Sequence, residues 1–462
     1  MESGELAIAA VAFIGVCFFL LKYIVGVFNG ADRKAGGRNE KQNIRSAASE
    51  EEKQTTTGQH HQQQQQQQQS VRKRVGGSSN HSTRKSQAVN LQHPWLVSTL
   101  KGHEGSVLDL SYSSNGKYLV SSSQDCTVML WDVRDPNQKN RKSVKCNIRD
   151  YGVAHLVRFI PNGKGFVVCK ANNECEAFKL EKSPDGGIVM NAQGITSKVL
   201  PYDKGFEEDE SIVGLDIACT GKYVATCSTT SLVIWDMKGN ELSRISTESA
   251  RSKGGANRCC KISPCGKFIS ICCGRAIKMW EVMFNSSGEF EEIKAISGLP
   301  VGDYDDVAYD QNTSHMALVS QTKNTWEMFY TNVEFRKGTF LRLKVSGLYA
   351  GNDPPKVALS PDSHVVAVAS GNRLSIFSTL DADLLHVIED VESDPITAIL
   401  FDSSGKYLLE SIGRYVRVFH NVLGHRGNII AAREKLKEQQ TSATKERLQQ
   451  LIADSENFLK QF

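Results

Sequence analysis

The sequence has little net charge for its length, and the charge that it has is unevenly placed. Its 462 residues include 55 lysines and arginines against 51 aspartates and glutamates, a formal charge of +4. Residues 30–90 alone carry +6, whereas the chain after residue 90 carries −1. Nucleic-acid-binding domains present a strongly basic surface. The nearly neutral main part of the chain therefore argues against nucleic acid as its partner.

The sequence also lacks the spacings that mark common catalytic sites. In its repeats, Gly-Lys is followed by Tyr, Phe or Gly and then by a strand pattern. A phosphate-binding loop needs Gly-Lys followed by Ser or Thr at the start of a helix, so nucleotide hydrolysis is excluded. No Ser-His-Asp or Cys-His grouping can be singled out. We therefore expect no enzyme activity, no catalytic residue, no cofactor and no small-molecule substrate.

The cysteines form neither a disulfide framework nor a standard zinc motif. Of the twelve, Cys17 lies in the apolar N-terminal segment and the other eleven fall in the strand-rich part of the chain at irregular spacing, where a reduced cysteine acts as a small hydrophobic residue. The densest group is Cys259, Cys260, Cys265, Cys272 and Cys273, which a hairpin at its middle residue would bring together. Such thiolates could hold zinc, but adjacent residues of a strand point to opposite faces. We expect packed side chains here and no metal.

One pattern is present seven times. Each copy alternates apolar and polar residues at period 2, turns, and alternates again, as in a β-hairpin. Five of the turns contain Gly-Lys, and the glycine suits a hairpin position that needs a positive φ. The copies begin at Ser113, Phe159, Ala218, Ser263, Tyr309, Ser360 and Phe401, with turns about 42 to 58 residues apart. Strand repeats of this length indicate propeller blades.

The first 28 residues contain an apolar segment that is long enough to cross a membrane. Residues 6–28 are apolar apart from Lys22, and a helix rising about 1.5 Å per residue spans a hydrocarbon core of about 30 Å with this length. The alternative is a signal peptide, but Glu2 and Glu5 precede the segment and basic residues follow it. We predict an uncleaved signal anchor, a transmembrane helix over 1–28, with the remainder in the cytosol.

Two more segments flank the repeats. Residues 29–90 contain eight consecutive glutamines and no apolar period, which predicts a disordered basic linker. Its run at 71–75 is either solvated linker, a lipid- or nucleic-acid-binding patch, or a nuclear signal. After a propeller over 91–421, residues 422–462 are charged and rich in helix formers, with an apolar stripe. We predict a short helical tail: a hairpin against the propeller, a frayed tail or a short coiled coil.

The first repeat and its lead-in resemble the WD40 repeat. Gly102-His103 matches the Gly-His of that repeat, and Trp131-Asp132 matches its Trp-Asp. The resemblance implies an all-β, seven-bladed WD40 β-propeller in which a histidine, a strand serine, a turn aspartate and the tryptophan form a buried hydrogen-bonded set. Carried over to this chain, the set is His103, Ser121, Asp125 and Trp131.

The other six blades depart from this pattern. Trp235 and Trp280 keep the tryptophan in blades three and four. In blades two, five, six and seven we expect a phenylalanine at that position, namely Phe178, Phe329, Phe377 and Phe419. These departures put the hydrogen-bonded set in doubt for six blades, but an aromatic side chain still packs between neighbouring sheets.

The order of the segments resembles a membrane-anchored, transducin beta-like branch of the WD40 family. An N-terminal anchor, a basic linker, seven degenerate blades and a charged helical ending carry the resemblance. It implies a single-pass protein of the endoplasmic reticulum membrane, with the propeller facing the cytosol and a link to the stress response of that organelle. Because a propeller must close on itself, we predict that 95–102 supplies the outer strand of the last blade.

The loops that lead into the blades form the candidate partner-binding face. These loops gather on one face of a WD40 propeller, and in this chain they are rich in acidic residues. The acidic residues singled out are Glu207, Glu208, Asp209, Glu210, Asp303, Asp305, Asp306, Asp353, Glu389 and Asp390. We expect a protein partner to dock here through a basic segment, with charge complementarity setting the association rate. The alternative is ordinary hydrated loops.

Two functions from different classes follow. The first is a non-catalytic protein-interaction scaffold, anchored in the membrane of the endoplasmic reticulum, which raises the local concentration of a protein partner. The alternative is a guanine-nucleotide exchange factor or regulator for a small GTPase of the secretory pathway. That alternative depends on fold analogy, and the propellers that suggest it carry their anchor after the propeller. RNA binding is a third and weaker hypothesis.

Overall fold

The structure of the protein, a computed structural model, describes the chain from residue 91 onward apart from several loops. The described residues are 91–135, 137–138, 143–148, 152–182, 188–191, 211–247, 255–274, 276–296, 302–321, 325–333, 341–345, 353–380, 382–389 and 394–462. The predicted anchor (1–28) and linker (29–90) lie outside these residues. Among the helices that the structure describes, none is both long enough and apolar enough to cross a membrane.

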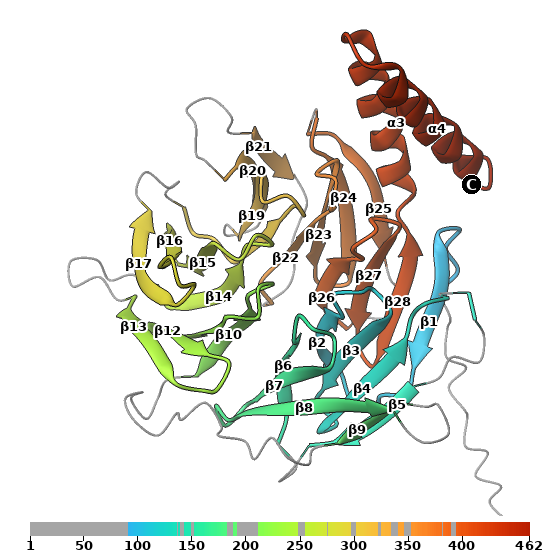
Figure 1. Cartoon of the computed structure of the whole chain (residues 1–462). Helices are drawn as coiled ribbons and strands as arrows, with labels where there is room; N and C mark the ends of the chain where they lie inside the picture. Colours follow the sequence, from blue (N-terminus) through green and yellow to red (C-terminus); the bar gives the residue numbers. More distant parts are fainter. Residues whose placement is uncertain are drawn as a thin grey trace, which may run out of the picture. The chain divides into compact units, whose positions relative to one another are not determined.

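Seven four-stranded antiparallel sheets form the blades (Figure 1). Blade one contains β2 (Val107–Tyr112), β3 (Tyr118–Ser123), β4 (Thr127–Asp132) and β5 (Ser143–Asn147), and blade two contains β6 (Ala154–Phe159), β7 (Gly165–Lys170), β8 (Cys175–Lys182) and β9 (Ile188–Asn191). Blade three contains β10 (Ile212–Ile217), β11 (Tyr223–Ser228), β12 (Ser231–Asp236) and β13 (Glu241–Ser246), and blade four contains β14 (Asn257–Ile262), β15 (Phe268–Cys273), β16 (Ala276–Phe284) and β17 (Phe290–Ile296).

The remaining three blades continue the same order. Blade five contains β18 (Asp306–Tyr309), β19 (His315–Gln321), β20 (Trp326–Asn332) and β21 (Leu341–Val345), and blade six contains β22 (Lys356–Leu359), β23 (Val365–Ser370), β24 (Arg373–Ser378) and β25 (Leu384–Glu389). Blade seven contains β26 (Ile396–Phe401), β27 (Tyr407–Ile412), β28 (Tyr415–His420) and β1 (Leu96–Lys101). The seven-bladed all-β propeller expected from the repeats is confirmed.

The last blade takes its outer strand from the other end of the propeller sequence. β1 pairs antiparallel with β28, with Thr99 opposite Arg417 and Lys101 opposite Tyr415. The first strands of successive blades contact one another from β2 to β26, and β26 contacts β2. The predicted closure by the strand after Trp95 is therefore confirmed, and the ring of blades is complete.

The hydrophobic core lies between neighbouring blades. Leu110 and Trp131 of blade one, for example, pack in one cluster with Leu409 and Val418 of blade seven. Each sheet alternates its apolar side chains between two faces and buries both of them against its neighbours, so that no face of a central strand is left in water. This arrangement explains why strands such as β11 and β23 are buried at every position.

The strand register confirms the expected aromatic position in six blades and corrects it in the fifth. In blade one, Trp131 lies opposite Leu119 in the β3–β4 ladder. At the matching place in blade five, Met316 lies opposite Thr331 and not opposite Phe329. Phe329 lies two residues earlier on the same face, half-buried, with its ring 5.5 Å from that of Tyr304. A slip of two residues preserves alternation, so the sequence pattern could not detect it.

The hairpin turns adopt the expected left-handed conformation. Glycine has a positive φ in five of them, as in Gly116 (φ 65°) and Gly266 (φ 72°). Blades five and six lack the glycine, yet Thr313 (φ 57°) and Ser363 (φ 65°) take the same backbone conformation there. Since a side chain is strained in this region, the surrounding turn must impose it.

Two antiparallel helices end the chain and confirm the predicted helical tail. α3 (Val422–Lys437) begins directly after β28, and α4 (Ser442–Leu459) follows a short break (Figure 1). The side chains of Asn421 and Thr441 cap the two helices by accepting hydrogen bonds from amides three residues on. His425 stacks on Phe458 with ring centroids 4.1 Å apart. Of the alternatives left open, the structure shows the hairpin.

We predict that Leu100→Ala lowers the free energy of unfolding by about 2–5 kcal/mol, because Leu100 in the closing strand is 4% exposed and packs in the core shared by blades seven and one. Urea denaturation of the two proteins measures this difference. Leu384→Ala is the matched control: it makes the same change in another outer strand, where the side chain is 51% exposed, and should cost less than about 0.5 kcal/mol. Equal losses would show that the closing strand carries no special load.

Candidate functional site

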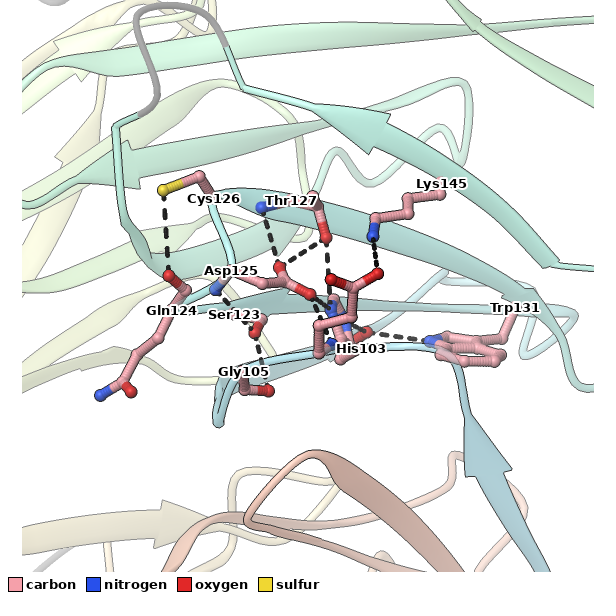
Figure 2. A network of polar contacts seen from close by, with 11 residues as sticks. His103, Gly105, Ser123, Gln124, Asp125, Cys126, Thr127, Trp131 and Lys145 are labelled. Carbon is pink, nitrogen blue, oxygen red and sulfur yellow. Dashed lines mark hydrogen bonds and ion pairs between the residues drawn. The ribbon is translucent and has the colours of Figure 1, made fainter. Parts of the chain in front are cut away.

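The structure brings the four polar residues of blade one into one hydrogen-bonded chain (Figure 2). Trp131 Nε1 donates to Ser121 Oγ at 2.9 Å, and Ser121 Oγ lies 2.7 Å from His103 Nε2. His103 Nδ1 lies 3.0 Å from Asp125 Oδ2. An ionised carboxylate can only accept, so the proton of the neutral histidine resides on Nδ1, facing Asp125. Nε2 then accepts from the Ser121 hydroxyl, which itself accepts from the indole.

The surroundings hold this cluster in one protonation state. Burial lowers the pKa of His103, although the Asp125 carboxylate opposes the change, and the ring is therefore neutral at neutral pH. Burial would raise the pKa of Asp125, but hydrogen bonds from Thr127, the Glu104 amide and His103 outweigh it and lower that pKa to about 2. Both ring nitrogens and the carboxylate are thus engaged in joining the loop before β2 to the turn after β3. The cluster stiffens the loop face and has no free base for chemistry.

A second polar cluster occupies the centre of the ring. The first strands of all seven blades line a cavity of about 150 Å³, which is small for a ligand site. The Arg158 guanidinium lies in it, donates to Asp109 and to the Val157 carbonyl, and places its Nε 3.6 Å from Asp216 Oδ1. Its side chain is 13% exposed.

The aspartates of this cluster join consecutive blades. Asp109 of blade one accepts from the Val157 amide of blade two at 2.9 Å, and Asp216 of blade three accepts from the Ile262 amide of blade four at 2.8 Å. Asp306 of blade five accepts from the Val357 amide of blade six at 3.1 Å. The sequence reasoning missed this set. Its available signal was an aspartate in each of three inner strands, β2, β10 and β18, whose other residues are mostly apolar.

Two of the predicted docking residues are not on the surface. Asp305 is 4% exposed, pairs with Arg258 and accepts from the Gln321 amide at 2.7 Å. Asp306 is 7% exposed and joins blades five and six as described above. Both carboxylates are buried and bind groups of a neighbouring blade, so the expectation that they meet a partner directly is wrong. A loop sequence does not reveal which acidic residues its neighbours will bury.

Three of the predicted docking residues are exposed. Asp303 is 51% exposed at its side chain and lies 3.1 Å from Arg258, and Glu389 is 65% exposed and lies 3.9 Å from Arg373. Asp353 is also exposed. The residues Glu207, Glu208, Asp209, Glu210 and Asp390 lie outside the described residues. Where it is described, this loop face therefore mixes exposed acidic and basic side chains and is not uniformly acidic.

The strand register of blade four brings only two of its five cysteines directly opposite each other. Cys259 lies opposite Cys272, Cys260 lies opposite Ile271, and the cysteines of these two strands are buried. Cys265 is exposed in the turn between the strands. Within the part of the chain that the structure describes, no three His, Cys, Asp or Glu side chains are placed to hold a metal ion together. The geometry offers packing here and no tetrahedral set of thiolates.

We predict that Arg158→Met lowers the free energy of unfolding by about 3–5 kcal/mol, because it leaves the carboxylates of Asp109 and Asp216 uncompensated beside the cavity. Denaturation midpoints measure the loss. Adding Asp216→Asn to Arg158→Met should recover part of it, since the second substitution removes one of the two stranded charges. Strictly additive losses in the double variant would contradict the proposed coupling.

Comparison with known proteins agrees with the repeat pattern. The model of the WD domain, G-beta repeat, matches residues 94–132, which span β1 to β4 and so straddle the closing blade and blade one. Transducin beta-like protein 2 of Mus musculus is 33% identical over 383 residues, covering 81% of this chain and 84% of the relative. The Homo sapiens protein of that name is 33% identical over 384 residues, with 81% and 83% covered. Target of rapamycin complex subunit LST8 of Saccharomyces cerevisiae is 23% identical over 165 residues, with 35% and 46% covered.

Proposed function

The chain belongs to the transducin beta-like protein 2 family of WD40-repeat proteins, and from this premise we propose that it is a non-catalytic scaffold in the endoplasmic reticulum membrane. The propeller faces the cytosol and holds a protein partner close to that membrane, in the service of the organelle's stress response. WD40 propellers are protein-interaction modules, and one relative is named as a subunit of a complex. Membrane attachment comes from the apolar segment over 6–28.

The observation that carries the scaffold proposal is that the polar groups with catalytic chemistry are already engaged in hydrogen bonds inside the propeller. His103 and Asp125, which have the chemistry of a general base and its orienting acid, are consumed inside blade one. Arg158 is engaged with Asp109 inside the central cavity. The loop face, in contrast, presents exposed charged side chains such as Asp303 and Glu389 on a stiff frame. A rigid surface of exposed charges favours specific binding, because little conformational entropy is lost on association.

Charge complementarity sets the kind of partner segment that fits. Each described exposed acid lies at the end of a blade connection: Asp303 before β18, Asp353 before β22 and Glu389 at the end of β25. A partner segment with basic residues would pair with these carboxylates, while the neighbouring arginines Arg258 and Arg373 reject a uniformly basic one. We therefore propose a partner segment of alternating charge that is basic on balance, a refinement of the purely basic segment expected from the sequence.

The alternative function is guanine-nucleotide exchange, or its regulation, for a small GTPase of the secretory pathway. Its support is analogy of fold, and the analogy places the anchor at the opposite end of the chain. A nucleotide-release assay with GTPases of that pathway separates the two functions. Clear acceleration by the full chain would replace the scaffold proposal, and unchanged release would leave it standing.

We predict that microsomes carrying the full chain with a tag after Phe462 lose the tag to added protease and show no glycan on the propeller. Two glycosylation sequons serve as reporters, at Asn285 between β16 and β17 and at Asn312 between β18 and β19. Both asparagines are exposed, so the lack of a glycan would report compartment and not burial.

The experiment uses Ser82→Ala throughout, because this change removes a third sequon, at Asn80 in the linker. The matched controls are Ser287→Ala and Ser314→Ala on that background, which remove the two propeller sequons and identify any glycosylated band. Digestion of the tag without a glycan supports a cytosolic propeller. A protected tag with glycans that vanish in the two control variants would place the propeller in the lumen and would overturn the proposed topology, and the reading of the cysteines as reduced thiols with it.

We predict that neutralising the exposed acids of the loop face, with Asp303→Asn, Asp353→Asn and Glu389→Gln together, lowers labelling of true partners several-fold. Quantitative proximity labelling by the full chain in cells measures this, because a weaker or slower association shortens contact with the partner. The control triple Glu291→Gln, Glu292→Gln and Glu446→Gln makes the same charge change on β17 and α4. If every partner survives the first triple at control level, the loop face is not the docking site.

A further inference from the structure

Two cysteines of neighbouring blades are exposed in equivalent turns. Cys219 lies in the turn between β10 and β11, and Cys265 lies in the turn between β14 and β15. Among the described cysteines these two are exposed, Cys126 and Cys146 are half-buried, and the others are buried. The two exposed thiols are therefore the ones that a soluble reagent can reach most easily.

The two turns touch each other at the cysteines. The sulfur of Cys219 lies 3.3 Å from the point that a Cβ atom on Gly266 would occupy, and Gly266 directly follows Cys265. Each turn is closed by its own hydrogen bond, from the Gly221 amide to Ala218 and from the Gly266 amide to Ser263, both 2.8 Å long. The contact therefore brings the Cys219 sulfur to the residue next to Cys265, and the two thiols are close enough to influence each other's ionisation.

The surroundings give the two thiols different acidity. Partial burial opposes ionisation of Cys265, but hydrogen bonds from Ser263 and Thr313 outweigh it and lower the pKa of this thiol. Ser263 Oγ lies 3.3 Å from the sulfur, and the Cys265 amide donates to Thr313 Oγ1 at 3.0 Å. Partial burial and the neighbouring Cys265 raise the pKa of Cys219. An exposed thiol with a lowered pKa beside a second thiol is the arrangement typical of redox-sensing cysteine pairs.

We propose that Cys265 is a peroxide-reactive cysteine and that Cys219 is its resolving partner, so that oxidation joins blades three and four by a disulfide. In the first step the Cys265 thiolate attacks one oxygen of hydrogen peroxide, the O–O bond breaks, a sulfenic acid forms and hydroxide leaves. In the second step the Cys219 thiol attacks the sulfenic sulfur, the S–S bond forms and water leaves. The two sulfurs together lose two electrons, which reduce the peroxide.

A second pair of cysteines in the same molecule provides an internal control. The sulfurs of Cys169 and Cys175 lie 3.1 Å apart across the β7–β8 ladder, but these residues are 0% and 3% exposed. Burial raises the pKa of Cys169 well above its usual range. The two sulfurs of this pair are close together but inaccessible to a soluble reagent, so the pair should stay reduced when the exposed pair reacts.

The test treats the reduced full chain, in detergent, with hydrogen peroxide, blocks the remaining thiols and maps the tryptic peptides without reduction. Cys219 and Cys265 fall in separate peptides that contain no other cysteine, ending at Lys222 and Lys267. We expect a cross-linked peptide that contains both, which dithiothreitol separates again. We also expect the Cys265 thiol to be lost about tenfold faster than the half-buried Cys146 thiol. A cross-link between Cys169 and Cys175 in its place, or equal rates at Cys146, would overturn the proposal.

Variants assign the two roles. Cys219→Ser should stop the reaction at the sulfenic acid, so that dimedone labels Cys265, whereas Cys265→Ser should abolish peroxide-dependent loss of the Cys219 thiol. Cys146→Ser is the matched control and should leave the cross-link unchanged. Dimedone labelling of Cys265 that is no greater in Cys219→Ser than in the wild type would refute the resolving role. The wild-type peptide map does not depend on how well these variants fold.

Discussion

The pairing of β1 with β28 is the constraint on which the rest of this structure depends. A strand from the start of the propeller sequence completes the last blade, and this joins two segments that lie about 320 residues apart in the sequence. Each blade buries both of its faces against neighbours, so an open ring would leave two apolar faces and two strand edges in water. Closure removes that exposure for all blades at once. It is opposed by the chain entropy that is lost when two segments so far apart in the sequence are brought together.

Closure also allows individual blades to lose their characteristic residues. Blade one keeps the full hydrogen-bonded set of His103, Ser121, Asp125 and Trp131, and blade three keeps the bond from its tryptophan, Trp235, to Thr226 at 2.7 Å. Elsewhere aromatic packing and aspartates of the inner strands connect the blades. Once the ring is closed, each sheet needs only to fill the space between its neighbours, and several kinds of side chain do this equally well.

Contacts between blades also determine which acidic loop residues a partner can reach. Acidic residues that a loop sequence presents as a group are divided by the fold, because Asp305 and Asp306 turn inward to hold blades together while Asp303 stays exposed. Exposed side chains on a stiff closed ring suit the recognition of protein segments. The exposed Cys219 and Cys265 form the proposed point of redox control, where a turn of blade three touches a turn of blade four.

The sequence alone was sufficient to predict the seven blades, the positive φ of the glycine turns, the closing strand and the helical tail. These features follow from local periods and from residues with restricted backbone conformations, which act over a few neighbours in the chain. Only the tertiary structure decided that Thr331 and not Phe329 takes the aromatic position of blade five, that Arg158 lies among aspartates of the channel, and that the turns of Cys219 and Cys265 touch. Those outcomes depend on register and on contacts between blades, which bring together residues about 15 to 60 positions apart and leave no periodic trace in the sequence.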